Sequence, residues 1–168
     1  MIRAYLDSSP RIAPSAWVAP SAEVIGDVEI GEDSSVWFQC VVRADVFPIR
    51  IGARTNIQDH SVLHVTHDRY ATVLHDEVTV GHRVVLHGCT IESGALVGIG
   101  AVVLDRAVVG AGALVGAGAL VTPGTKIPPG MVAMGSPAKV VREVTDAELA
   151  WMQESARNYV TYARRYAG

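Results

Sequence analysis

All six histidines of this 168-residue chain lie in one stretch, Ile51–Gly88. Through most of the chain an aliphatic residue recurs every six positions, and the stretch keeps this period up to Leu63 and has resumed it by Leu86. If the irregular segment between them is one looped-out hexad, the two leucines lie three hexads apart, which is one triangular coil of a hexapeptide β-helix. His64 and His87 then follow the inward leucines on adjacent coils, about 4.8 Å apart. Two imidazoles stacked in this way can converge on one metal ion.

A third histidine, His82, has a different phase in the repeat. It comes two residues after the aliphatic Val80, so we expect it to point in another direction, towards a neighbouring subunit. This phasing indicates a metal site shared between chains. The remaining histidines, His60, His67 and His75, are interpreted as solvated loop residues.

The same period defines the elements that must position these side chains. Outside the histidine-rich stretch, the inward positions are Ile12, Val18, Val24, Ile30, Val36, Val42, Ile91, Val97, Val103, Val109, Val115, Val121 and Ile127. This predicts a mainly β fold, a parallel β-helix of roughly six coils over residues 12–135. Residues 1–11 are predicted to form an N-terminal arm, and residues 136–168 a connector and helix packed on the β-helix. The step from Leu86 to Ile91 is one residue short, and the pattern does not explain it.

The start of the terminal helix is marked by a capping box. Thr145 is followed three residues later by Glu148, so the sequence predicts a helix from about Asp146 to Tyr166. An approximate apolar stripe is expected to pack it on the β-helix, made of Trp151, Met152, Ala156, Tyr159, Val160 and Ala163.

Composition excludes several classes of function. Fourteen Lys and Arg against seventeen Asp and Glu give a net charge of −3, so no basic surface for nucleic acid is expected. No run approaches the roughly 18–20 apolar residues of a membrane helix, and the first ten residues lack the apolar run of a signal peptide. Two cysteines, Cys40 and Cys89, do not form a disulfide framework. We therefore expect a cytoplasmic protein with no membrane partner.

Four segments carry a resemblance to a known family. IGARTNIQDHSVLHVTH and VTVGHRVVLHGCTI, with VGIGAVVLD and GSPAK further on, resemble the gamma-class carbonic anhydrases, especially their compact bacterial members. The resemblance runs from about Ala16 to the terminal helix. It implies a left-handed parallel β-helix, a homotrimer, and zinc, or else Fe²⁺ or Co²⁺, between subunits. The implied reaction is the reversible hydration of CO₂ to bicarbonate by metal-bound hydroxide.

The resemblance also assigns roles to individual residues. His64 and His87 match the two metal ligands of one chain and His82 the ligand of its neighbour. Three neutral imidazoles leave a coordination position of zinc open for water, which is the catalytic rather than the structural pattern. The other implied site residues are Gln58 as the hydrogen-bond partner of the hydroxide, Arg43 and Asp59 as a buried ion pair, Asp45 as a carboxylate of the subunit interface, Asn56 as a neighbouring polar residue, and Tyr159 as a hydroxyl that reaches over the metal.

Two departures from the family bear on the rate. Val46 follows Asp45 where the archetype has a glutamate, and the acidic loop residue that transfers protons there is missing. His67 holds the matching position, and a histidine with a pKa near 6.5 can shuttle protons. We therefore expect weak activity with a complete metal site.

Two other classes of function stay open. One is a hexapeptide acyltransferase or CoA-thioester enzyme, which GSPAK and the coil corners also fit. The other is a non-catalytic trimeric binding protein that keeps the metal as cement. Independently of the class of function, Arg43, Asp45 and Asp59 have the alternative of being purely structural ion pairs that hold the trimer, and Tyr159 that of packing only.

Overall fold

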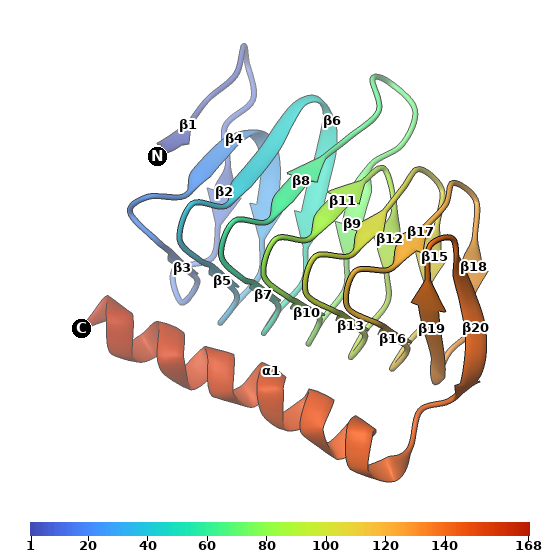
Figure 1. Ribbon diagram of the computed structural model, residues 1–168. Coiled ribbons are helices and arrows are strands. Elements are labelled where there is room, and N and C mark those ends of the chain that lie inside the picture. The colour runs from blue at the N-terminus through green and yellow to red at the C-terminus, as the bar shows by residue number, and fades with distance from the viewer.

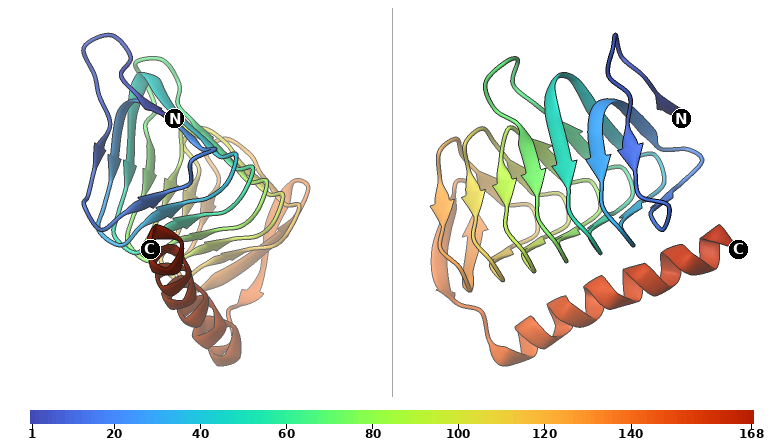
Figure 2. Two further views of the ribbon diagram at one scale, coloured as in Figure 1. Left: turned by 90° about the vertical axis from the view of Figure 1, so that its left-hand side faces the viewer. Right: turned by 180° about the vertical axis from the view of Figure 1, so that it is seen from behind.

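Short parallel strands wind around a triangular cross-section, and one long helix runs beside them (Figure 1). The computed structural model describes all residues, Met1–Gly168. Figure 2 shows the triangular coils along their axis, with both chain termini at the same end of the molecule. The predicted fold class, a left-handed parallel β-helix with a C-terminal α-helix, is confirmed.

The strands form three faces. The first face contains β1 (Ile2–Arg3), β4 (Glu23–Ile30), β6 (Val41–Ile51), β8 (Val62–His64), β11 (Val85–His87), β14 (Val102–Val103) and β17 (Leu120–Val121). The long strands β4 and β6 continue onto the second face, where they lie with β2 (Arg11–Ile12), β9 (Thr72–Leu74), β12 (Thr90–Ile91), β15 (Val108–Val109) and β18 (Lys126–Ile127). The third face contains β3 (Trp17–Val18), β5 (Ser35–Val36), β7 (Asn56–Ile57), β10 (Thr79–Val80), β13 (Leu96–Val97), β16 (Leu114–Val115), β19 (Met131–Gly135) and β20 (Ala138–Glu143). All pairs are parallel except β19 with β20.

The register of the first face is fixed by a ladder of inward aliphatic side chains. Its rungs, none of them accessible to solvent, are Val24, Val42, Leu63, Leu86, Val103 and Val121. Leu63 pairs directly with Leu86, as the looped-out hexad predicts. The extra residues leave the coil between β8 and β9 as a loop, residues 65–71 (Figure 1).

The short step in the period falls at the corner between β11 and β12. Gly88 occupies this corner with φ +57, a left-handed conformation that is cheap for glycine. The corner is one residue shorter than the others, and Ile91 still reaches its inward position, where it is fully buried. The step that the pattern left unexplained is therefore a local change of corner geometry.

The C-terminal helix α1 (Asp146–Ala167) begins where the capping box predicts. The Thr145 side chain accepts from the Glu148 backbone, and the Glu148 carboxylate accepts from the Thr145 backbone. The helix runs back along the third face (Figures 1 and 2) and buries Met152, Ala156 and Ala163. Trp151, expected in the packed stripe, is 54% exposed, because it lies at the edge of the contact. The helix is too polar to span a membrane, and the structure contains no other helix.

Aromatic side chains hold the far end of α1 against the first coils. The rings of Trp37 and Tyr159 lie 5.2 Å apart, and those of Trp17 and Tyr166 lie 5.4 Å apart. Arg164 adds an ion pair with Asp33 at 3.0 Å. The arm contributes a strand to the first face, because β1 pairs with β4, and β19 continues the third face next to β16. The boundaries proposed for the arm and the connector stay predictions.

Candidate metal centre

The fold places His64 and His87 side by side on the first face. They are paired residues of β8 and β11, and both side chains point outward, 20% and 33% exposed. Nδ1 of His64 lies 3.3 Å from Nε2 of His87. Two nitrogens that bind one tetrahedral zinc ion at 2.0–2.1 Å are about 3.3–3.4 Å apart. The two imidazoles therefore already have the spacing of two ligands of one ion, as the phasing of the repeat predicts.

Each of the three predicted ligands has a carboxylate on its other ring nitrogen. Nε2 of His64 lies 3.0 Å from Asp45, and Nδ1 of His87 lies 2.7 Å from Asp105. Nδ1 of His82 lies 3.0 Å from Asp59. Carboxylates on the far nitrogens of metal-binding histidines are a recurrent arrangement, because they fix the tautomer and the orientation of the ring.

These contacts determine where the lone pairs of the rings point. An ionised carboxylate only accepts hydrogen bonds, so the ring nitrogen that faces it carries the proton. In the neutral imidazoles, Nδ1 of His64 and Nε2 of His87 are then both lone-pair nitrogens, and they face each other at 3.3 Å. Two opposed lone pairs repel unless a cation lies between them. The donor set therefore fits a divalent metal ion.

The carboxylates beside the two imidazoles are ionised more readily than usual. Burial raises the pKa of Asp45, but hydrogen bonds from His64 and Arg43 outweigh burial and leave the pKa below its ordinary value. Burial also raises the pKa of Asp105, and hydrogen bonds from His87 and Thr66 again bring the net pKa below the ordinary value. Both groups thus stay anionic acceptors at neutral pH.

The predicted ion pair between Arg43 and Asp59 is not formed within the chain. Arg43 pairs instead with Asp45, two residues further along β6, where both side chains project from the first face. Asp59 lies at the corner after β7 on the third face and pairs with His82. In the single chain the side chains of Arg43 and Asp59 are 43% and 29% exposed, and their expected burial beside the site stays a prediction.

His82 belongs to a different part of the chain from the other two imidazoles. It lies in the corner that follows β10, on the coil next to the Asp59 corner, and its side chain is 43% exposed. No group of three or more His, Cys, Asp or Glu within the chain is arranged to hold a metal ion. We call His64 and His87 with their carboxylates the paired half-site, and His82 with Asp59 the single half-site.

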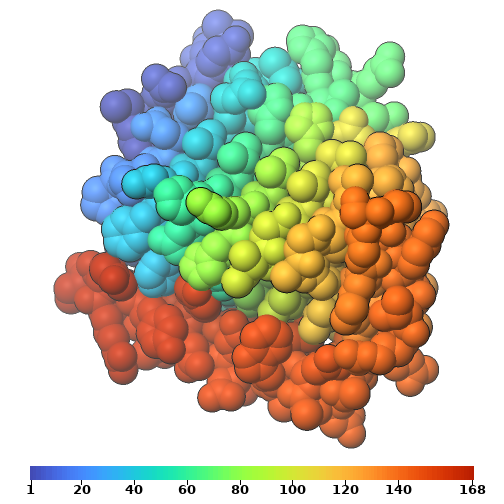
Figure 3. Space-filling view, in the orientation of Figure 1, coloured from blue at the N-terminus to red at the C-terminus, as the bar shows by residue number.

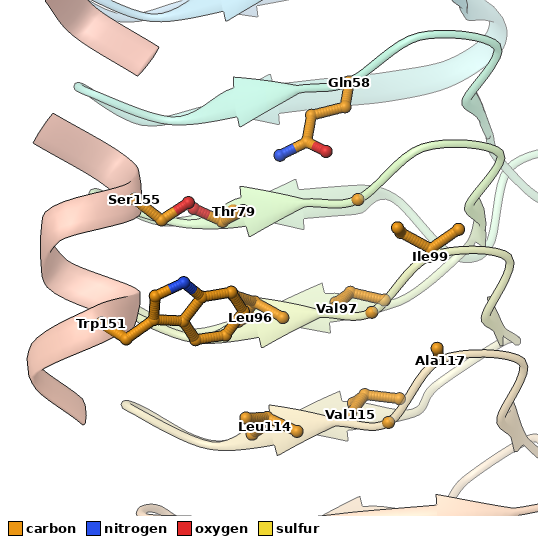
Figure 4. A pocket seen from close by; sticks show the side chains of 13 residues that line it. Gln58, Thr79, Leu96, Val97, Ile99, Leu114, Val115, Ala117, Trp151 and Ser155 are labelled. Carbon is orange, nitrogen blue, oxygen red and sulfur yellow. The ribbon is translucent and has the colours of Figure 1, made fainter. Parts of the chain in front are cut away.

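Gln58 and Asn56 lie with the single half-site. Both are buried, and the Gln58 carboxamide nitrogen donates to Asn56 Oδ1 at 3.2 Å. Asn56 in turn donates to Thr79 Oγ1 at 3.0 Å. These bonds leave the carboxamide oxygen of Gln58 free for another partner. Figure 4 shows this carboxamide at one end of an apolar hollow of about 270 Å³ between the third face and α1.

The helix contributes Tyr159 to the same region. Its ring packs edge-on against Trp37, and its pKa is raised by burial and by the nearby charge of Asp59. Tyr159 and Asp59 both line a hollow of about 510 Å³ at the end of the helix. The expected reach of this hydroxyl over a metal stays a prediction.

The other histidines lie at the surface. His67 is 73% exposed, on the loop of residues 65–71, with Nε2 2.9 Å from Asp68. Together with Asp45 it lines a hollow of about 390 Å³. His60 is a corner residue with φ +62, and His75 is exposed.

The sequence reasoning missed Asp105, although it contacts a predicted ligand directly. Asp105 lies eighteen residues after His87, which is one residue beyond the next coil's matching position, because Leu86 pairs with Val103. The spacing from His87 to the aspartate that ends VGIGAVVLD could have indicated this contact.

Comparisons with known proteins find similar chains among the carbonic anhydrases and one similar structure with a different name. No family model matches the chain. The carbonic anhydrase of Geobacillus kaustophilus is 48% identical over 99% of this chain and 91% of its own length. The mitochondrial gamma carbonic anhydrase 2 of Arabidopsis thaliana is 48% identical over 96% of this chain, which spans only 60% of that relative. A solved Bacillus cereus protein, named as a candidate acetyltransferase, has a TM-score of 0.96 and 46% identity over 98% of this chain and 95% of its own.

Proposed function

The chain belongs to the gamma carbonic anhydrase family, and from this premise we propose that it catalyses the reversible hydration of CO₂ to bicarbonate. The proposed site holds zinc between two copies of the chain in a homotrimer. His64 and His87 of one copy and His82 of another would bind the ion.

The observation that carries the proposal is the paired half-site. Its two lone-pair nitrogens face each other at 3.3 Å, and each ring is fixed by a carboxylate on its far side. A bound zinc with three imidazoles would retain a position for water and lower the pKa of that water to about 7, a value established with carbonic anhydrase itself.

The chain's own residues would then position ligands and substrate. Asp45 and Asp59 hold the tautomers of His64 and His82, and Arg43 holds Asp45 in turn. The hydrogen bond to Asn56 orients the carboxamide of Gln58 and leaves its oxygen free. That oxygen can accept a hydrogen bond from a hydroxyl group in the site. The apolar hollow beside Gln58 offers an uncharged approach for CO₂.

Two measurements test this proposal. Purified protein should contain about one zinc ion per chain, and zinc-loaded protein should hydrate CO₂ in a stopped-flow assay. His64→Ala, His82→Ala and His87→Ala should each lose stoichiometric metal and activity. His75→Ala is the matched control, since its side chain is exposed and unpaired, and it should retain both.

These two measurements, together with an assay of acyl transfer from CoA, separate the other two classes of function. A full zinc content without CO₂ hydration would indicate a trimer that uses the metal as cement. Protein that binds no metal but transfers an acyl group from CoA would indicate an acyltransferase, the activity named for the Bacillus cereus structure.

A further inference from the structure

Asp105 links a predicted metal ligand to the loop of residues 65–71. One carboxylate oxygen lies 2.7 Å from Nδ1 of His87, and the other accepts the hydroxyl of Thr66 at 2.8 Å. We propose that Asp105 is a positioning residue that aims the imidazole of His87 at the metal and transmits the position of the loop to that imidazole. The inference rests on the proposed function, in which His87 binds the ion.

The two hydrogen bonds hold the carboxylate at both oxygens. A carboxylate bound at one oxygen can rotate about its Cβ–Cγ bond, whereas one bound at both has a fixed plane. The plane of Asp105 then determines the plane of the His87 ring, whose Nε2 points at His64. A ring aimed in advance loses less orientational freedom when the ion binds.

Gly88 makes this contact possible. A Cβ at position 88 would collide with the carboxylate of Asp105, and it would come within 3.0 Å of the Cβ of Tyr70. The bare corner therefore lets Asp105 reach across to His87 from the following coil. The Gly88 backbone N–H also donates to Thr72 Oγ1 at 2.9 Å, and that hydroxyl donates to the His64 carbonyl at 2.5 Å.

A second contact ties the loop to the same coil. The guanidinium of Arg106 lies 5.6 Å from the centre of the Tyr70 ring, within the range of a cation–π interaction. The loop is thus held at Thr66 and at Tyr70 by two consecutive residues, Asp105 and Arg106. Figure 3 shows the loop as a projection from the edge of the molecule. A contact that moves the loop would therefore also move the Asp105 carboxylate and, with it, the ring of His87.

The experiment measures the zinc dissociation constant by competition with a chromophoric chelator. Asp105→Ala should weaken zinc binding by about 10–100-fold, the usual cost of losing such a carboxylate, and Asp105→Asn by less. Glu92→Ala is the matched control, because Glu92 also accepts a hydrogen bond from the next coil, at Ala111, without contacting a histidine. Its dissociation constant should equal that of the wild type.

The melting temperature of the metal-free protein separates positioning from stability. A positioning role predicts that Asp105→Ala and Glu92→Ala lower this Tm by similar amounts, while only Asp105→Ala weakens zinc binding. An unchanged dissociation constant in Asp105→Ala would overturn the proposal.

Thr66 tests the link to the loop. Thr66→Val should weaken zinc binding, whereas Thr66→Ser, which keeps the hydroxyl, should bind zinc like the wild type. Added to Asp105→Ala, Thr66→Val should not weaken zinc binding further, because both substitutions act through one carboxylate. Losses that multiply in the double variant would refute the link. If the wild type binds no zinc, or His87→Ala keeps it, the proposed function itself has failed. If His87→Ala loses zinc and Asp105→Ala does not, only the role of Asp105 has failed.

Discussion

Mixing two metal-free variants should restore part of the metal sites, because each proposed site combines the paired half-site of one copy with the single half-site of another. His87→Ala destroys the paired half-site and keeps the single one, whereas His82→Ala does the reverse. Alone, each variant assembles with every site incomplete. In a mixed trimer, a site is complete wherever a His82→Ala chain supplies its His64 and His87 to a neighbour that supplies its own His82.

The expected recovery follows from the symmetry of the ring. With equal amounts and random assembly, the paired half-site is intact in half of the sites, and half of those face an intact His82, which leaves about a quarter of the sites complete. Every mixed trimer, whichever variant is in excess, contains about one complete site. Co-expression with two different affinity tags isolates the mixed trimers, and zinc is then measured after a chelator wash.

A second mixture is the control. His64→Ala and His87→Ala both damage the paired half-site, so no arrangement of these two chains contains a complete site. This mixture should bind no zinc even when its trimers carry both tags. No recovery in the first mixture, or equal recovery in the second, would refute the division of ligands between copies.

Three further predictions concern stability and rate. Gly26→Ala should lower the free energy of unfolding by at least about 3 kcal/mol, and Gly100→Ala by only about 1–2 kcal/mol, as measured by chemical denaturation. Both glycines have positive φ, but only at position 26 would the new Cβ collide with the backbone of the next coil. Equal losses would contradict this reasoning. The hydrogen bond from Arg142 and those from Thr145 lower the pKa of Glu148 from 4.5 to about 2. A lowered pKa stabilises the fold above the ordinary value, so the Tm advantage of wild type over Glu148→Gln should be full at pH 6 and fade as the pH falls towards about 2, and a constant difference would refute it. His67→Ala should slow CO₂ hydration at low buffer concentration only, and imidazole buffer should restore the rate, because a mobile base can replace the side chain; a rate indifferent to both would exclude a proton relay through His67.

The sequence was sufficient to predict which two imidazoles meet. An inward aliphatic side chain has only one place to go in a narrow coil, so Leu63 and Leu86 lock the register, and His64 and His87 must follow. The start of the helix was equally determined, because the capping box is a local arrangement of four consecutive residues.

The partners of the imidazoles could not be predicted in the same way. Outward polar side chains are not restrained by the core, so their contacts depend on the corners. Arg43 turned to Asp45 instead of Asp59, and Asp105 reached His87 only because the corner at Gly88 is short and bare. Such contacts depend on the details of backbone geometry, which a six-residue period does not contain.

The spacing of the coils in a β-helix prevents three stacked histidines of one face from binding the same ion. Adjacent coils are about 4.8 Å apart, so two stacked imidazoles reach one ion easily, whereas coils two steps apart are separated by about 9.6 Å. Nitrogens bound to the same zinc ion cannot be more than about 4 Å apart. A third histidine on the ladder of His64 and His87 would therefore have to bend more than 5 Å out of register. In the proposed site a single chain would therefore supply two ligands from one face, and the third would come from another copy, where His82 has its own carboxylate partner.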